Sequence, residues 1–473
     1  MSVHENSDLK ALFAAQRAAF AEDSRPSLAA RRQRLDRILA LTGRHRRRIA
    51  DAISADFGHR SPRETEMADI FAVLSGVRHS RRHLAGWMKS RRVATPLHLL
   101  PARSRLIRQP LGVVGVISPW NYPFQLAMLP AAAALAAGNR VMIKPSELTP
   151  SFSSLLAEIV AEEFSPDECV VVAGGVETGE AFSRLPFDHL LFTGSTAVGR
   201  KVALAAADAL TPVTLELGGK SPVILDSGCD LTAAARRIAF GKLLNAGQTC
   251  VAPDYVLVPA AICEAFVDAL AGAMRGMYPR LADNPDYSSI VSGRHYQRLE
   301  RLIADAEAKG ARVLTSNPAG ETLDPLRRKL APAILTGVTE DMAVMQEEIF
   351  GPILPVLSYD GLEQALAFVN ARPRPLALYW FGDDGERRDR VLAGTWSGGV
   401  TVNDVIWHVC QDNLPFGGVG ASGMGAYHGE HGFRTFSKEK PVLLQSRFNG
   451  LALFRPPYGL LFDGLLAILK RYF

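Results

Sequence analysis

Cys250 and Glu216 are the residues of this chain whose types best suit chemistry at a carbonyl carbon. Cys250 ends the run Gly247-Gln-Thr-Cys250, and Glu216 lies upstream in Leu215-Glu-Leu-Gly-Gly-Lys220. A cysteine thiolate attacks electrophilic carbon, and a nearby carboxylate can act as general base for water. The flanking glycines let the backbone come close to a ligand. The pair can therefore run thiol chemistry that ends with attack by water.

Each of these two residues alone has a more ordinary interpretation. Free cysteine is among the most buried residue types, so Cys250 by itself favours a structural thiol. Glu216 by itself is most often a surface carboxylate or one half of an ion pair. Only further motifs in a consistent order can separate these interpretations from the chemical one.

Asn121 is the candidate donor to an oxyanion. It lies between Trp120 and Tyr122 in Ser118-Pro-Trp-Asn-Tyr-Pro123, where two prolines restrict the backbone. An amide held in this way can stabilise a developing negative charge. An aromatic turn that packs on the core is an equally good interpretation of the same run.

A glycine pair indicates a candidate dinucleotide site. Gly194 and Gly199, in Phe192-Thr-Gly-Ser-Thr-Ala-Val-Gly199, lie between an expected strand and an expected helix, where backbone N–H groups can face an anion. The spacing differs from the G-x-G-x-x-G fingerprint, so a plain turn remains an alternative. Lys144 and Glu147 follow the preceding strand and add a cation and a carboxylate where a ribose could lie. A solvated ion pair is their alternative.

Strands and helices are expected to alternate through most of the chain. Residues 8–90 have the apolar periodicity of helices. Strands are expected at 113–117, 141–143, 169–173, 190–192, 221–225 and 255–258, and helices at 125–137, 151–163, 196–210 and 296–309. This spacing is typical of βαβ units, so it predicts an α/β fold with parallel sheets whose ligands bind at the carboxyl ends of the strands.

Composition narrows the class of protein. A chain of 473 residues, 48% hydrophobic and 21% charged, is globular and long enough for two or three domains. The net charge of +5 is concentrated in arginines such as those at 44–48. We interpret them as solvated helix faces and expect no nucleic-acid partner, because aromatic interleaving and zinc spacing are lacking. Five scattered cysteines favour neither a metal site nor disulfides, which fits the cytoplasm.

The chain closes with an interrupted apolar tail at 451–473. Arg455, two prolines and Asp463 break it, and no uninterrupted apolar run of about 18 residues occurs elsewhere, so no membrane span is expected. A short helix at 460–471 could lie on a membrane, pack on a partner subunit or cover a substrate entrance. Packing within an oligomer is the favoured expectation, and peripheral membrane contact by the tail is the alternative.

Together these residues resemble the aldehyde dehydrogenase superfamily over about residues 110–436. Seven motifs occur in the order of that family: Pro119-Trp-Asn-Tyr-Pro123, Lys144-Pro-Ser-Glu147, Phe192-Thr-Gly-Ser195, Leu215-Glu-Leu-Gly-Gly-Lys220, Gly247-Gln-Thr-Cys250, Glu347-Glu-Ile-Phe-Gly-Pro352 and Pro415-Phe-Gly-Gly418. The short N-terminal region and the run at 247–255 are similar to the class 3 branch, which includes fatty, benzaldehyde-type and coniferyl aldehyde dehydrogenases.

The resemblance implies a role for each candidate residue. Cys250 would be the nucleophile, Glu216 the base that activates water, and Asn121, with the backbone N–H of Cys250, the oxyanion hole. Implied cofactor contacts are Trp120, Lys144, Glu147, Gly194, Ser195, Gly199, Leu217, Glu348 and Phe350, and implied neighbours of the substrate are Tyr122, Trp407 and Phe416. NAD is the expected cofactor because Glu147 would repel a 2′-phosphate, and Lys144 leaves NADP open.

The same resemblance implies two Rossmann-like parallel-sheet domains and a small β domain in a homodimer. The expected boundaries are an NAD(P)-binding domain at 1–92 and 114–217, a catalytic domain at 218–402, a bridging and oligomerisation domain at 93–113 and 403–450, and the tail at 451–473. The implied reaction oxidises an aldehyde to its carboxylic acid through a cysteine thiohemiacetal and thioester.

The substrate expectation is coniferyl aldehyde or a related aromatic aldehyde, from the run at 242–255 and from Arg455-Pro-Pro-Tyr458. A medium- or long-chain fatty aldehyde is the alternative, since aromatic walls suit an alkyl chain nearly as well. A CoA-acylating enzyme is disfavoured by Glu216, because relatives of that kind usually lack this carboxylate. A catalytically silent nucleotide-binding scaffold is disfavoured by the intact Cys250, Glu216 and Asn121.

Overall fold

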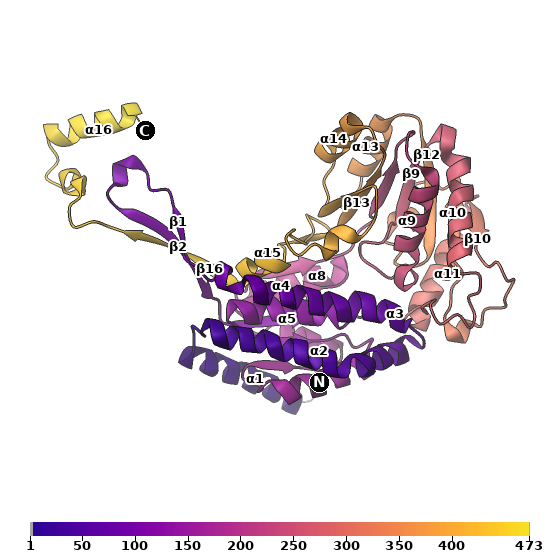
Figure 1. Ribbon diagram of the computed structural model, residues 1–473, viewed down its shortest axis with the longest axis horizontal. Coiled ribbons are helices and arrows are strands. Elements are labelled where there is room, and N and C mark those ends of the chain that lie inside the picture. Colours follow the sequence, from indigo (N-terminus) through magenta and orange to yellow (C-terminus); the bar gives the residue numbers. More distant parts are fainter. Residues whose placement is uncertain (1–2, 473) are drawn as a thin grey trace.

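Three β-sheets with helices on their faces make up the structure, a computed structural model that describes residues 3–472 (Figure 1). Two of the sheets are mainly parallel, and the third is small and antiparallel. The α/β fold class predicted from the alternation of strands and helices is therefore confirmed.

The first sheet has six strands and contains most of the candidate motifs. Its strands are β3 (Val113–Ile117), β4 (Arg140–Lys144), β5 (Cys169–Val171), β6 (His189–Thr193), β7 (Val213–Glu216) and β15 (Gly423–Met424). They lie in the order β15-β7-β6-β3-β4-β5, and each neighbouring pair is parallel except β15 with β7. Every residue of β4 and β6 is buried, as expected for strands covered on both faces.

Helices from two parts of the chain cover this sheet. They are α1 (Val3–Glu22), α2 (Leu28–Phe57), α3 (Pro62–Thr65), the π-helical turn η1 (Glu66–Phe71), α4 (Ala72–Trp87), α5 (Gln125–Ala137), α6 (Pro150–Glu163), α7 (Val176–Ser183) and α8 (Thr196–Ala207). In α2 the residues Leu35, Ile38, Ile49 and Ile53 recur at helical spacing and are fully buried. The helical N-terminal region predicted from periodicity is thereby confirmed.

The second sheet has seven strands and follows the first in the chain. Its strands are β8 (Pro222–Leu225), β9 (Tyr255–Pro259), β10 (Arg312–Thr315), β11 (Ala333–Thr336), β12 (Ile353–Tyr359), β13 (Ala377–Phe381) and β14 (Gly399–Val402). Their order is β10-β11-β12-β9-β8-β13-β14, parallel except for β10 with β11. The accompanying helices are α9 (Leu231–Leu243), η3 (Leu244–Gly247), η4 (Ala260–Ile262), α10 (Cys263–Met277), α11 (Gly293–Ala308), η5 (Pro325–Arg327), α12 (Ala343–Gln346), α13 (Leu362–Asn370) and α14 (Gly385–Gly394).

The third sheet forms an arm that extends away from the other two (Figure 1). It consists of β1 (Arg91–Val93), β2 (Arg103–Pro110) and β16 (Ser437–Leu444), in that order. The remaining segments are η2 (Leu97–Leu99), η6 (Trp407–Cys410), α15 (Gly429–Thr435), η7 (Gly450–Phe454) and α16 (Leu460–Tyr472). Helix α16 lies at the far end of the arm. Within residues 3–472, no helix has the length and apolar character to cross a membrane.

The arginines at 44–48 lie on an exposed face of α2, which confirms the solvated helix face predicted from sequence, and two of them also pair with glutamates. Arg44 pairs with Glu163 at 2.9 Å, and Arg48 pairs with Glu158 at 2.8 Å, both on α6. The two arginine side chains remain 57% and 47% exposed. These cations therefore face glutamates of a neighbouring helix, an arrangement that a periodicity argument on α2 alone cannot predict.

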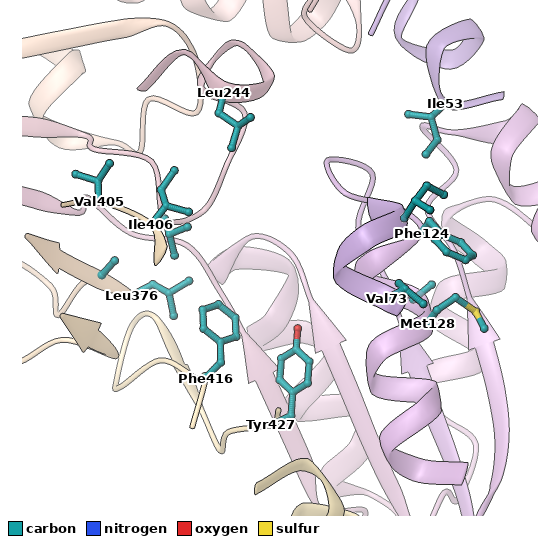
Figure 2. Close-up of a cluster of buried hydrophobic side chains, with 14 of the residues drawn as sticks. Ile53, Val73, Phe124, Met128, Leu244, Leu376, Val405, Ile406, Phe416 and Tyr427 are labelled. Carbon is teal, nitrogen blue, oxygen red and sulfur yellow. The ribbon is translucent and has the colours of Figure 1, made fainter. Parts of the chain in front are cut away.

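A continuous apolar cluster connects the helices of the first sheet to the second sheet (Figure 2). On one side it contains Ile53, Val73, Phe124 and Met128, and on the other Leu244, Leu376, Val405, Ile406, Phe416 and Tyr427. Since both sheets share this core, the loops that leave their facing sides are held by packing from both.

Candidate active site

The carboxyl edge of the first sheet collects several of the predicted site residues. Glu216 is the last residue of β7, and Lys144 is the last residue of β4. Gly194 directly follows β6, and the loop with Asn121 follows β3. Because carboxyl ends of parallel strands share one edge, the sheet brings these residues together where open α/β sheets bind ligands.

The turn before Cys250 has a strained backbone that places the cysteine. Asn245 and Ala246 have φ values of 53° and 51°, in the region that non-glycine residues rarely adopt, and Gly247 follows with φ of 76°. A Cβ added at Gly247 would lie 2.3 Å from the carbonyl oxygen of Gly351, so only glycine fits there. The N–H groups of Cys250 and Val251 donate toward the Cys250 thiol. The turn thus directs backbone donors at the sulfur of Cys250.

Two hydrogen bonds join the loop of Asn121 to the loop of Cys250. The Asn121 Nδ2 donates to the carbonyl oxygen of Gln248 at 3.1 Å, and the hydroxyls of Tyr122 and Thr249 lie 2.6 Å apart. Asn121 is only 3% exposed. An amide nitrogen has two hydrogens, so one remains to donate to a ligand. The structure therefore brings the predicted oxyanion donor beside the predicted nucleophile.

The Cys250 thiol is held in its neutral form in this conformation. Burial, followed by the carboxyls of Glu348 and Glu216, raises the pKa of Cys250 to about 12, against the partial compensation of the two backbone N–H groups. A thiolate is the nucleophile, so activation has to come from added positive charge or from protonation of these carboxyls.

Glu216 is a buried carboxyl that interacts with the thiol. It is 2% exposed, and no described residue offers a hydrogen-bond partner to Oε1 or Oε2. Desolvation raises its pKa well above the usual range for glutamate. Buried oxygens of this kind are normally satisfied by ordered water. A carboxyl with raised pKa beside a nucleophile is suited to activating such a water.

Glu348 rests directly on the glycine motif that follows Glu216. A Cβ at Gly218 would lie 2.0 Å from Oε2 of Glu348, so the carboxylate needs the glycine. Burial and Asp254 raise the pKa of Glu348 to about 8, while the Gly219 N–H, Lys220 and Arg298 lower it. Glu348 therefore packs on the glycine motif that follows Glu216, and its charge raises the pKa of the Cys250 thiol.

Phe350 and Trp120 contact each other beside this carboxylate. Their rings meet edge to face with centroids 5.4 Å apart. Phe350 has φ of 50°, an unusual value for a bulky residue, and the preceding segment is held by Arg298, which donates to the carbonyl of Glu348 at 3.1 Å. The two sequence motifs that contain these aromatic residues therefore meet in space.

The start of α8 has the geometry of an anion site. Added Cβ atoms at Gly194 and Gly199 would lie 2.6 Å from Phe192 and from Leu217, respectively, so both glycines permit close packing of helix on sheet. Ser195 caps the helix by accepting from the Val198 N–H at 3.4 Å and is exposed. Free N–H groups at an exposed helix start suit a pyrophosphate.

Lys144 and Glu147 differ in environment. The Lys144 Nζ donates to the carbonyl of Pro145 at 2.7 Å, and burial lowers the pKa of this amine. Glu147 is exposed, three positions beyond the end of β4. A helix start for phosphates, a cation, an exposed carboxylate and the carboxylate of Glu348 together fit a nicotinamide dinucleotide.

The three predicted substrate neighbours lie at different depths. Tyr122 is 6% exposed, and burial is the main cause that raises its pKa above the usual value for tyrosine. Phe416 is 8% exposed and lies beside Tyr427 in Figure 2. Its ring meets that of Tyr427 edge to face and stacks on His428. Trp407 is 45% exposed and stacks on Phe240. Only Tyr122 and Phe416 are therefore in the buried core.

Tyr427 is a site residue that sequence patterns do not indicate. It is 1% exposed, and its hydroxyl has no hydrogen-bond partner within the part of the chain that the structure describes. Burial, together with the nearby Glu216 and Cys250, raises its pKa above the usual range. Nothing in the run Gly425-Ala-Tyr-His428 indicates this proximity, which arises because β15 pairs with β7.

Comparison with known proteins places the chain in a family. The sequence model of the aldehyde dehydrogenase family matches residues 1–442. A coniferyl aldehyde dehydrogenase of Pseudomonas sp. (strain HR199) is 51% identical, over 95% of this chain and 94% of that protein. The substrate-bound state of Staphylococcus aureus AldH is 39% identical with a TM-score of 0.92 and covers 99% of this chain and 100% of its own.

A second solved structure includes a bound dinucleotide. A variant of P. syringae AldA indole-3-acetaldehyde dehydrogenase in complex with NAD+ and IAA is 26% identical with a TM-score of 0.84, covering 93% of this chain and 89% of its own. With the fold, the family match and these similarities in agreement, the chain belongs to the aldehyde dehydrogenase family, whose members oxidise aldehydes with NAD(P).

Proposed function

We propose that the enzyme oxidises coniferyl aldehyde or a related aromatic aldehyde to its carboxylic acid, with Cys250, Asn121 and Glu216 as catalytic residues. The observation that supports this assignment best is the bond from the Asn121 amide to Gln248, two positions before Cys250. The aromatic substrate class is supported by the identity to the Pseudomonas coniferyl aldehyde dehydrogenase and by Tyr122 and Phe416 in the core.

In the first step the Cys250 thiolate forms a bond to the aldehyde carbon, and the carbonyl electrons move to its oxygen. The free N–H of the Asn121 amide and the backbone N–H of Cys250 donate to this oxyanion. Loss of one such donor typically costs about 2.7–4 kcal/mol of transition-state stabilisation. Removal of hydride from the thiohemiacetal then leaves a thioester on Cys250.

Bound NAD(P)+ supplies the acceptor for that hydride. We assign its binding to the start of α8 with Gly194, Ser195 and Gly199, and to Lys144 and Glu147 at the end of β4. The remaining contacts are assigned to Trp120, Leu217, Glu348 and Phe350. NAD is the preferred form because the exposed carboxylate of Glu147 repels a 2′-phosphate, and NADP is the alternative.

In the last step Glu216 removes a proton from water, which attacks the thioester and releases the acid and the free thiol. The raised pKa of Glu216 makes its carboxylate a stronger base than an exposed glutamate. The missing hydrogen-bond partners described above leave its oxygens available to a water. A thioester whose release depends on this carboxylate gives an acid rather than an acyl-CoA.

We also propose a cytoplasmic homodimer assembled through the arm, with the domain boundaries given in the sequence analysis. Strand β16 is an edge of its sheet, and edges invite pairing. Leu443 and Leu444 in this strand are 49% and 45% exposed, and Phe448 and Leu460, which follow it in the chain, are 88% and 91% exposed. Peripheral membrane contact by α16 is the alternative. Light scattering coupled to size exclusion, with and without lipid vesicles, separates the two.

A panel of aldehydes tests the proposed substrate class. We expect kcat/KM to be highest for coniferyl aldehyde, intermediate for benzaldehyde and lowest for a series of alkanals, followed through NAD(P)H absorbance. A maximum at medium or long alkanals would overturn the aromatic assignment. Product analysis with and without CoA should give the free acid in both cases, and an acyl-CoA product would contradict the role of Glu216.

A further inference from the structure

Arg60, in the segment between α2 and α3, is a fully buried cation beside the oxyanion donor. Its Nη1 donates to the backbone carbonyl of Asn121 at 2.9 Å, and its guanidinium carbon lies 4.8 Å from the centre of the Tyr122 ring. Its Nη2 forms an ion pair with Asp69 at 3.1 Å, in which both side chains are 0% exposed. Burying such an ion pair costs desolvation free energy, so the pair by itself is weak evidence for added stability. Its contacts with the neighbouring backbone therefore matter more, because they fix the position of the segments that they bind.

Asp69, the partner of Arg60, binds the far end of the loop that contains Asn121. Its Oδ1 accepts hydrogen bonds from the N–H groups of Phe124 and Gln125, at 3.1 and 3.0 Å. Arg60 therefore holds the loop at Asn121, while its partner holds the point where the loop enters α5. The conformation of the loop after β3 is set from the N-terminal helices.

The same carbonyl of Asn121 also connects to the cysteine turn. Asn245 donates to it through Nδ2 at 3.0 Å, and the N–H of Asn245 donates to Oε1 of Glu64 at 3.1 Å. Glu64 in turn accepts from the hydroxyl of Ser288 at 2.7 Å. Arg60 and Glu64, four positions apart, thus hold the two loops whose separation fixes the distance from the amide of Asn121 to Cys250.

We propose that Arg60 is a positioning residue of the oxyanion hole, which orients the Asn121 amide toward the aldehyde oxygen by fixing the backbone carbonyl of the same residue. This inference rests on the proposed role of Asn121. Arg60 lies outside every sequence motif of the site, and its side chain is 0% exposed and so has no access to substrate or cofactor. We nevertheless expect this side chain to control the rate of aldehyde oxidation.

Arg60→Lys is the informative substitution. Lysine retains the charge opposite Asp69 but lacks the planar fork of donors, so it cannot bond the Asn121 carbonyl and the carboxylate with the same geometry. We expect kcat for aldehyde oxidation to fall by about 10- to 100-fold, less than the 10²- to 10³-fold typical of removing an oxyanion donor itself. The KM for NAD should change less than about twofold, because the expected loss falls on the transition state.

Arg34→Lys is the matched control. Arg34 lies on α2, its side chain is 4% exposed, and it likewise contacts a carboxylate, Glu168 at 2.7 Å, and a backbone carbonyl, that of Asn139 at 3.4 Å. Neither Glu168 nor Asn139 lies in the loop of Asn121 or in the loop that leads to Cys250. The control therefore reports the effect of replacing a buried arginine without disturbing Asn121, and its kcat should remain within about twofold of wild type.

Two further measurements separate positioning from general damage. Alkylation of Cys250 by iodoacetamide, followed by peptide mass spectrometry, develops no oxyanion, so its rate should be unchanged in Arg60→Lys. In a double-mutant cycle, Arg60→Lys should add little to the loss caused by Asn121→Ala, because the amide that it positions is already gone.

The outcomes are distinguishable from failure of the proposed function. Loss of kcat in Arg60→Lys with unchanged alkylation, together with non-additivity with Asn121→Ala, would support the inference. A loss no greater than that of Arg34→Lys, a fully additive loss, or a parallel loss of alkylation would overturn it, while wild-type aldehyde oxidation would leave the proposed function standing. A wild type inactive on every aldehyde of the panel would overturn the proposed function and the inference together.

Discussion

The side-chain amide of Asn121 donates to the backbone carbonyl of Gln248 over 3.1 Å, across the junction between the two parallel sheets. One loop follows β3, and the other leads from η3 to Cys250. The bond therefore links an amide donor from the first sheet to the cysteine from the second. Because this bond holds the Asn121 amide close to the loop of Cys250, we expect activity to depend on both Asn121 and Cys250.

Asn121→Ala should reduce kcat/KM for aldehyde oxidation by about 10²- to 10³-fold, because it removes one preorganised donor to the oxyanion. Asn121→Asp should be at least as severe, since a carboxylate repels the developing charge. Steady-state NAD(P)H absorbance measures both. The melting temperature should be recorded alongside, because the variant also loses the bond to Gln248. Full activity in Asn121→Ala would rule out the assigned role.

Glu348→Gln should make the Cys250 thiol more reactive in the absence of cofactor. After burial, Glu348 is the largest cause of the raised pKa of Cys250, and the amide removes that negative charge. We expect the rate of iodoacetamide alkylation to rise several-fold at pH 9, above the raised pKa of about 8, where Glu348 of the wild type is mostly ionised. Glu347→Gln is the control, because it changes the neighbouring carboxylate, which is exposed and forms an ion pair with Arg298 at 3.0 Å. An unchanged rate in Glu348→Gln would contradict the electrostatic account of the thiol.

Glu147→Gln should shift cofactor preference toward NADP. An exposed carboxylate near the adenosine ribose disfavours a 2′-phosphate, so its removal should lower the ratio of kcat/KM for NAD to that for NADP by several-fold. Glu158→Gln on α6 makes the same chemical change elsewhere and should leave the ratio as it is. A ratio that also stays constant in Glu147→Gln would show that this carboxylate is not at the ribose.

Glu216→Gln should stabilise the fold at alkaline pH. The folded pKa of Glu216 is raised above its unfolded value of about 4.3, so between these two pKa values the folded state keeps a proton that the unfolded state releases. Within that window the free energy of unfolding of the wild type falls by about 1.4 kcal/mol per pH unit. The glutamine variant does not show this fall, because glutamine does not titrate. The difference in free energy of unfolding between variant and wild type should therefore increase from pH 5 to pH 8. Denaturant titrations at both pH values measure it, and a constant difference would contradict the raised pKa.

Some elements and site residues can be predicted from sequence because their cause is local. Helix α5 has the bounds expected from its run of small residues, and Gly138, with φ of 100°, ends it. Cys250, Glu216 and Asn121 each lie in a contiguous motif, and the parallel sheet brings the ends of such motifs together.

The rest depends on contacts that no local pattern encodes. Arg60 lies just beyond Gly58, the left-handed cap of α2, where the helical periodicity stops. Its partner Asn121 is 61 positions away. The many arginines of the N-terminal region give no signal that this one is buried, whereas Arg44 is more than half exposed. Tertiary packing decides which arginine is buried and which groups surround it.

The most direct test of the proposed roles of Cys250 and Glu216 is to measure the mass of the Glu216→Gln variant after its reaction with coniferyl aldehyde and NAD. Without the carboxylate that activates water, the thioester on Cys250 should persist. Intact mass spectrometry should then show one acyl group added, located at Cys250 by peptide mapping and absent from the double variant Glu216→Gln with Cys250→Ala. One burst of NADH per active site should accompany it. Continued steady-state release of acid at the wild-type rate, with no adduct on Cys250, would contradict the division of work between Cys250 and Glu216.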